Sequence, residues 1–533
     1  MGRNFTRQFK KVLAEYDFRD LTAIIILCSH FYENSEEEKD EYEEIKNLYA
    51  KVLAFYNFDS KNTQIDYSDN CTIENIRLSL FDYLTKKCKN DYSQLKSLAK
   101  QKKISSKQLL YELSSPKTFA KTFIETLPIK LRPFNDFLID KYGIDSAFIQ
   151  NACESILKRM LSPCSKDEII THRITNISRC FPSTFLDDMI SINDKFSELL
   201  DINTFSKNVC FPVVKCGEEY HLISPEVFID NFYKCIHRLY YKNSNKEQKD
   251  SMGILKGALF NEACEQLFIN FGFSNILSNY YYNDGEIDLL VIDKDVLFVV
   301  ECKSRNYTDK VSSESNAYEK ANNSNLDSAS KQVHRFIDKL NASGEVTLNK
   351  KEDKVKICRG NYEFIIPVVI NLENLAELNS DFERREKNAI YISFDDLWII
   401  REIIDTRKWL IIDFFAQILE NENEKALADD VIDMFPFYCQ YKNMSILFSK
   451  KYNILIHNLG NDFFQEYFSY KTDLNPISYF GNDISRFKYT NEDSYKKIIE
   501  KYHQSYWKTE DDFINEKHHS ILNDRFRTSI KKL

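Results

Sequence analysis

The chain has 533 residues and a mass of 63.0 kDa, which exceeds what one hydrophobic core organises, so we expect two to four domains. Hydrophobic residues make up 43% of it and Gly and Pro number only 11 and 10, which excludes disordered and fibrous classes. A net charge of −9 does not indicate a nucleic-acid-binding protein, but it leaves room for a local basic surface that contacts phosphates.

The cysteines and the N-terminus indicate the compartment. The 13 cysteines form no CxxC pair and are scattered through apolar segments, which argues against zinc ribbons and disulfide frameworks and for reduced thiols. The first ten residues lack an apolar signal core, and the run at residues 21–28 is too short to cross a bilayer. We therefore expect a soluble, cytoplasmic protein without membrane association.

Residues 1–205 are expected to form a helical N-terminal region. Apolar residues recur at three- and four-residue spacing in 42–58, 73–83, 107–113 and 147–161, and the Lys-rich run 86–103 is interpreted as a solvated helix face. Residues 206–249 follow as a connector. Alternation of apolar and polar residues over 209–224 predicts a hairpin that turns at Cys216, Gly217 and Glu218. Pro225 is predicted to start a helix that reaches Tyr241. Residues 243–249 are interpreted as a linker.

The sequence GEIDLLVIDKDVLFVVECKS at residues 285–304 stands out. It predicts two apolar strands joined by a polar turn at 293–295, and such continuous apolar runs are typical of strands covered on both faces. The polar exceptions are Glu286 and Asp288 where the first strand begins, and Glu301 and Lys303 where the second ends.

Strand alternation places Glu301 and Lys303 on one face and Cys302 on the other. In an antiparallel hairpin, Asp288 then lies beside Glu301. Two carboxylates favour a hard cation such as Mg²⁺, and Lys303 could orient an attacking water or offset charge on a phosphoryl oxygen. This is the chemistry of phosphodiester hydrolysis. The alternative is an ordinary buried hairpin whose ends carry surface charges and a salt-bridged lysine.

These residues resemble the PD-(D/E)XK, or restriction-endonuclease-like, nucleases, in particular the Mrr-like and nuclease-related branch. The resemblance covers about residues 250–405. It includes Asp288 on the second core strand, the ExK signature Glu301-Cys302-Lys303 on the third, a preceding helix with Glu262 and a following helix with Gln332. Glu265 competes with Glu262, and Glu286-Ile287 stands where the motif has its Pro. A bare (D/E)xK string has no weight, and the order of elements supports the match.

The resemblance implies a multidomain α+β protein with a central αβββαβ restriction-endonuclease-like core at 250–405, and mostly helical flanking regions. It implies a metal site formed by Asp288, Glu301 and the backbone carbonyl of Cys302, filled by Mg²⁺ with Mn²⁺ as a substitute. Lys303, Glu262 and Gln332 complete the expected catalytic set.

The implied function is that of a metal-dependent endonuclease that acts on DNA, with double-stranded DNA as the expected substrate. By analogy of fold, the implied biological role is prokaryotic restriction or antiphage defence. A repair or recombination nuclease, a ribonuclease and a non-cleaving nucleic-acid sensor stay open as alternatives. Since the sequence contains no GxxxxGK[ST] phosphate loop, any motor or trigger would have to come from a partner protein. Oligomerisation is left open.

Three further expectations complete the chain. The polar residues 304–327 are interpreted as an insertion that serves either as a substrate loop or as a plain surface loop. Strands are predicted at 364–371 and 390–394, with Ser393 capping a helix that reaches Ile404. Residues 406–533 are expected to form a helical C-terminal region.

Overall fold

The computed structural model describes residues 2–22, 24, 72–80, 83–84, 120–161, 174–193, 210–304, 326–373, 389–404 and 407–420, and a few short stretches up to 449. Those residues fall into two compact units, the first ending at Lys249 and the second starting at Asp250. No helix among the described residues is long and apolar enough to span a membrane. The expectations for 42–58, 86–103, 107–113, the insertion from residue 305 to 325, and residues 450–533 lie outside the described part.

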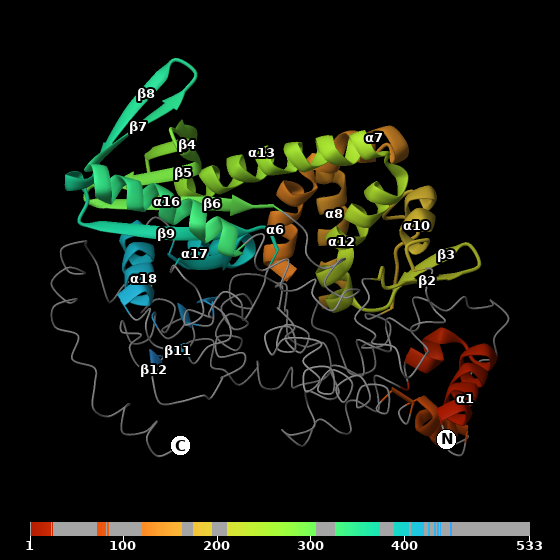
Figure 1. Ribbon diagram of the computed structural model, residues 1–533. Coiled ribbons are helices and arrows are strands. Elements are labelled where there is room, and N and C mark those ends of the chain that lie inside the picture. The colour runs from red at the N-terminus through yellow and green to blue at the C-terminus, as the bar shows by residue number, and fades with distance from the viewer. Residues whose placement is uncertain are drawn as a thin grey trace. The chain divides into compact units, whose positions relative to one another are not determined.

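The first unit is built mainly from helices (Figure 1). Their bounds are α1 Gly2–Glu15, a helix at 72–80, α6 Ala120–Leu131, η1 Arg132–Phe134, α7 Asn135–Tyr142, α8 Ser146–Leu161, α10 Ser183–Ile190 and α12 Pro225–Asn243. A small antiparallel sheet joins β1 Thr175–Asn176, β3 Glu219–Leu222 and β2 Val213–Cys216. The predicted hairpin and the helix beginning at Pro225 are confirmed.

Two sequence expectations for this unit need correction. The region was expected to be helical throughout, but β1 pairs with β3, because a two-residue strand leaves no periodic signal. The expected linker at 243–249 is shorter, since α12 ends at Asn243 and α13 begins at Lys246, which leaves only Ser244 and Asn245 between the helices.

The second unit is centred on a seven-stranded mixed sheet in the order β10-β9-β6-β5-β4-β7-β8. The strands are β4 Asn275–Tyr282, β5 Gly285–Asp293, β6 Val296–Lys303, β7 Glu345–Lys350, β8 Asp353–Cys358, β9 Phe364–Asn371 and β10 Ile390–Ser393. The helices are α13 Lys246–Asn270, α16 Ser328–Ser343, α17 Phe394–Ile404 and α18 Lys408–Glu420, with η4 Arg359–Asn361 between β8 and β9. The last described strands are β11 Lys425–Ala426 and β12 Phe448–Ser449, which pair with each other.

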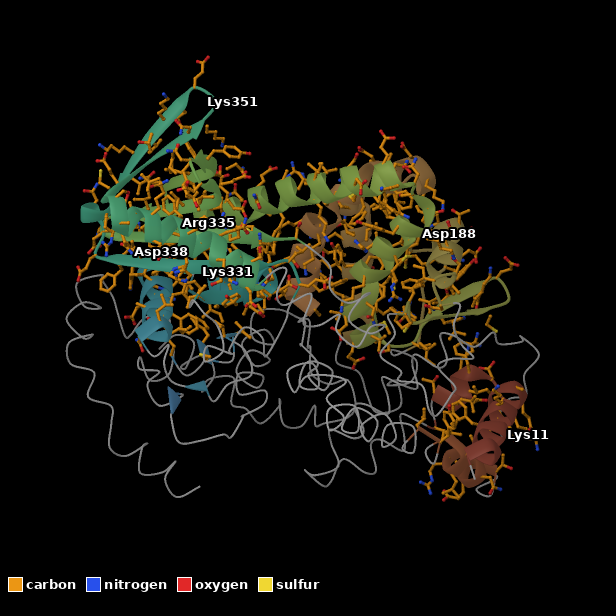
Figure 2. All side chains as sticks on the ribbon, in the orientation of Figure 1. Lys11, Asp188, Lys331, Arg335, Asp338 and Lys351 are labelled. Carbon is orange, nitrogen blue, oxygen red and sulfur yellow. The ribbon has the colours of Figure 1, made fainter. Side chains whose placement is uncertain are left out.

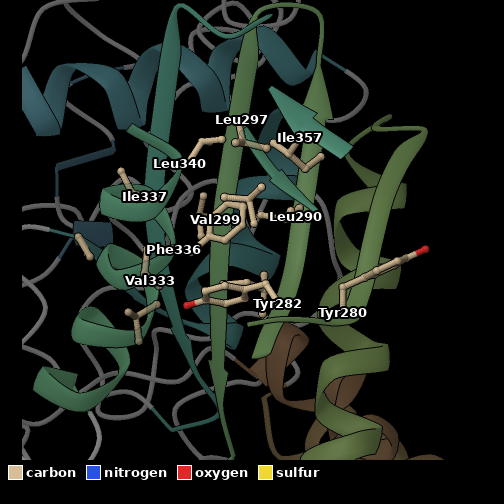
Figure 3. Close-up of a cluster of buried hydrophobic side chains, with 14 of the residues drawn as sticks. Tyr280, Tyr282, Leu290, Leu297, Val299, Val333, Phe336, Ile337, Leu340 and Ile357 are labelled. Carbon is tan, nitrogen blue, oxygen red and sulfur yellow. The ribbon is translucent and has the colours of Figure 1, made fainter. Parts of the chain in front are cut away.

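The predicted hairpin is present as β5 and β6. Strand β6 is buried along almost its whole length, as its uninterrupted apolar run requires, because helices cover the sheet on both faces. On one face α16 packs Val333, Phe336 and Leu340 over Leu297 and Val299 (Figure 3). On the other face, the ring of Phe298 contacts Phe268 of α13 and Phe415 of α18.

Strand directions position the ends of β6 and β9. β6 runs antiparallel to β5 but parallel to β9, which in turn is parallel to β10. The chain between β6 and β9 includes α16, the crossover that a parallel pair needs. The hairpin β7–β8 was not predicted and extends the sheet beyond β4 (Figure 1). Ser393 caps α17 as expected, its hydroxyl accepting the Asp396 amide hydrogen at 3.0 Å. A mixed α+β fold is therefore confirmed.

Candidate active site

Asp288 and Glu301 meet at the open end of the β5–β6 hairpin. The ladder pairs Leu289 with Val300, so these two carboxylates occupy the next facing positions. The chain reverses at Lys294, whose φ of 49° permits the tight turn between the strands. The register of the antiparallel strands β5 and β6 therefore brings together Asp288 and Glu301, which are 13 positions apart in the sequence.

Two neighbouring groups donate hydrogen bonds to the carboxylate of Asp288. Its Oδ2 accepts a hydrogen bond from the backbone N–H of Cys302 at 2.8 Å, and its Oδ1 accepts one from Asn261 Nδ2 at 3.0 Å. The Asn261 amide also donates to Asn279 Oδ1 at 3.0 Å. Asn279 has φ of 55°, a left-handed conformation that Asn adopts more readily than most residues. Each Asp288 oxygen retains a lone pair that can face a ligand.

Lys303 connects strand β6 with helix α16. Its Nζ donates to Glu301 Oε1 at 2.6 Å and to Gln332 Oε1 at 2.9 Å. The predicted common face of Glu301 and Lys303 is therefore present. Cys302 lies on the opposite face, where burial and the neighbouring thiol of Cys264 on α13 raise its pKa.

The electrostatics at this end of the sheet centre on Glu301. Its side chain is only 5% exposed, and that of Lys303 is 19% exposed. Burial, with the Asp288 carboxylate beside it, raises the pKa of Glu301 to about 8, although Lys303 opposes the shift. Two adjacent carboxylates in a buried place favour either a proton or a cation between them.

Glu262 and Asn261 differ in their contact with the cluster formed by Asp288, Glu301, Lys303 and Gln332. Asn261 contacts Asp288, whereas Glu262 is exposed and lies about 100° further round α13. The catalytic role of Glu262 stays a prediction, as does that of its competitor Glu265. Sequence reasoning missed Asn261 and Asn279. The buried stripe Phe260, Cys264 and Leu267 marks the sheet-facing side of α13, and Asn261 borders it.

The donor set suits a hard cation. Carboxylate oxygens are what Mg²⁺ prefers, and it is commonly held by one or two of them with water and substrate completing the shell. No cluster of three or more His, Cys, Asp or Glu side chains suited to a metal occurs within the described ranges. The carboxylate oxygens of Asp288 and Glu301 are of the type that Mg²⁺ and Mn²⁺ accept as ligands.

Comparison with known families identifies this part of the chain. Residues 256–370 match the nuclease-related domain (NERD) family. This span begins within α13, ends in β9 and includes all the residues of the cluster. No curated protein and no solved structure gave a significant match to the chain.

Proposed function

We propose, starting from the nuclease-related domain at residues 256–370, that the protein is a metal-dependent nuclease that hydrolyses phosphodiester bonds in DNA. The observation that carries the proposal is the contact of Asp288, Glu301 and Lys303 at one buried strand end. A surface salt bridge would not bury a carboxylate beside another carboxylate, because the cost of burying charge needs an offsetting partner.

The proposed core is the αβββαβ arrangement of the restriction-endonuclease-like nucleases. The supporting order is α13, the antiparallel strands β4, β5 and β6, then α16, and then β9 parallel to β6. In this view the β7–β8 hairpin is inserted between α16 and β9. The two carboxylates and the lysine come from the second and third strands, where that family carries them.

Each residue has an assigned task in the proposed site. Asp288, Glu301 and the Cys302 carbonyl would hold Mg²⁺ or Mn²⁺, which when bound polarises phosphate and lowers the pKa of water. Asn261 and the Cys302 amide orient Asp288. Lys303 holds a positive charge beside the reacting phosphate, and Gln332 faces the substrate from α16.

A basic side of α16 supports nucleic acid as the partner. Lys331, Arg335 and Lys339 recur every four residues on the helix that carries Gln332, and Lys339 forms an ion pair with Asp284. Lys331 and Arg335 are labelled on this helix in Figure 2, together with Asp338. Four residues advance about 6 Å along a helix, so the three cations span about 12 Å. A duplex presents a phosphate about every 3.4 Å along each strand, so this side can face several phosphates.

The proposed biological role is prokaryotic restriction or antiphage defence, supported by the resemblance to the Mrr-like branch. The sequence carries no phosphate-binding GxxxxGK[ST] loop, so a motor or a trigger would be a separate protein.

The test compares supercoiled plasmid, linear duplex, single-stranded DNA and RNA, each with Mg²⁺, Mn²⁺ or EDTA. The proposal expects cleavage of duplex DNA with either metal and none in EDTA. Cleavage restricted to RNA would reassign the protein as a ribonuclease. Binding without cleavage of any substrate would indicate a nucleic-acid sensor and contradict the proposal.

A further inference from the structure

Asn371, the last residue of β9, carries a buried amide without a partner. The residue is 1% exposed. Neither Nδ2 nor Oδ1 has a hydrogen-bond partner among the residues that the structure describes. An unpaired buried amide destabilises a fold, and most buried polar side chains are paired, so Asn371 calls for a reason other than stability.

The position of Asn371 is set by the parallel ladder between β6 and β9. In that ladder Lys303 pairs with Asn371, and Glu301 pairs with Val369. Paired residues of neighbouring strands share a face, and Val299 and Val369 indeed belong to one cluster beneath α16. The backbone N–H of Leu372 donates to the Lys303 carbonyl at 2.9 Å, which ties the two strand ends together. The amide therefore lies beside Lys303 on the face that carries Glu301.

The ammonium of Lys303 can donate a hydrogen bond to the Asn371 amide oxygen. A lysine has three N–H donors, and two of them reach Glu301 and Gln332. Gln332 lies on α16 with a partly buried side chain, and it is the group expected to turn toward substrate. When it does so, Lys303 loses one of its two acceptors.

We propose that Asn371 is a positioning residue whose Oδ1 accepts a hydrogen bond from Lys303 when Gln332 engages the substrate. The inference rests on the proposed nuclease function. It explains why a stability cost is kept at the end of β9, because strain and unpaired groups persist where function uses them. Exchanging the Gln332 acceptor for the Asn371 acceptor keeps the Lys303 ammonium in place while Gln332 contacts the substrate.

Two substitutions separate this role from a packing role. Asn371→Leu removes the amide at similar volume, and Asn371→Asp keeps an oxygen acceptor in the same place. The Leu variant should melt at a higher temperature than the native chain, bind duplex DNA in Ca²⁺ equally well, and lose single-turnover cleavage by about tenfold to a hundredfold, the value of one hydrogen bond to a charged group. The Asp variant should recover most of that loss.

Ile370→Val serves as the matched control, because it perturbs the same strand on the opposite face and should cleave normally. Native cleavage by the Leu variant would overturn the inference. A lower melting temperature of the Leu variant, with no recovery by the Asp variant, would show that the amide serves packing and would also overturn it. If the native chain cleaves nothing, the proposed function fails first, and that outcome is distinguishable because no variant is needed to see it.

Discussion

Replacing Glu301 by Gln should stabilise the protein in alkaline solution while it abolishes cleavage. Burial and Asp288 raise the pKa of Glu301 from 4.5 to about 8. The folded protein therefore binds more protons than the unfolded chain between these values, and its stability falls as the pH rises through that window. At about 1.36 kcal/mol per unit, the ionised carboxylate costs the fold about 5 kcal/mol above pH 8. An amide cannot ionise, and its oxygen still accepts from Lys303.

The assay is urea unfolding in EDTA of the native chain and the Glu301→Gln variant at about pH 5 and about pH 9. The two should be nearly equally stable at the lower pH, and the variant should gain several kcal/mol at the higher one. Glu286→Gln is the control, since this exposed carboxylate should change stability by less than about 0.5 kcal/mol at either pH. A difference that does not grow with pH, or a variant less stable at about pH 9, would refute the reasoning.

Three further predictions concern the surrounding residues. Lys303→Ala should reduce single-turnover cleavage at least about a hundredfold while duplex binding in Ca²⁺ survives, and near-normal cleavage would leave Lys303 only a salt-bridge partner. Asn261→Ala frees Asp288 from one hydrogen bond and should weaken activation by Mg²⁺ about tenfold to a hundredfold, measured as the metal concentration for half-maximal cleavage, and an unchanged concentration would count against it. Replacing both Lys331 and Arg335 by Ala should reduce the magnitude of the slope of log affinity for duplex DNA against log salt concentration by about 1.8. Replacing Lys10 and Lys11 on α1 by Ala should leave the slope unchanged. Equal slopes for the two double variants would reject α16 as the phosphate-binding side.

From the residues alone, sequence reasoning found the site residues that lie on β5 and β6. Alternation with period two, together with a turn at Lys294, suffices to place Asp288 beside Glu301 and to send Glu301 and Lys303 to one face. Gln332 was found because the resemblance supplied the order of elements, and α16 then brings it to Lys303.

The residues that sequence reasoning missed depend on contacts far apart in the chain. The stripe Phe260, Cys264 and Leu267 marks the side of α13 that faces the sheet, but Glu262 was chosen because the resemblance implies an acidic residue on this helix, and its neighbour Asn261 was not. Asn371 looks like an ordinary polar residue at the end of a strand. Only the pairing with β6 and β10 shows that its amide is buried beside Lys303. The β7–β8 hairpin was not predicted because each strand has only two apolar residues in alternation, Val346 and Leu348 in β7 and Val355 and Ile357 in β8, which is a short signal.

The central claim is that Asp288, Glu301 and Lys303 form a hydrolytic site that depends on a divalent cation. Single-turnover cleavage of one labelled duplex by the native chain and by Asp288→Asn, in Mg²⁺ and in EDTA, tests it most directly. The substitution keeps the shape of the side chain and its contact with the Cys302 amide but removes one of two carboxylates available to the cation. The account predicts cleavage only by the native chain in Mg²⁺, and cleavage in EDTA or undiminished cleavage by Asp288→Asn would contradict it.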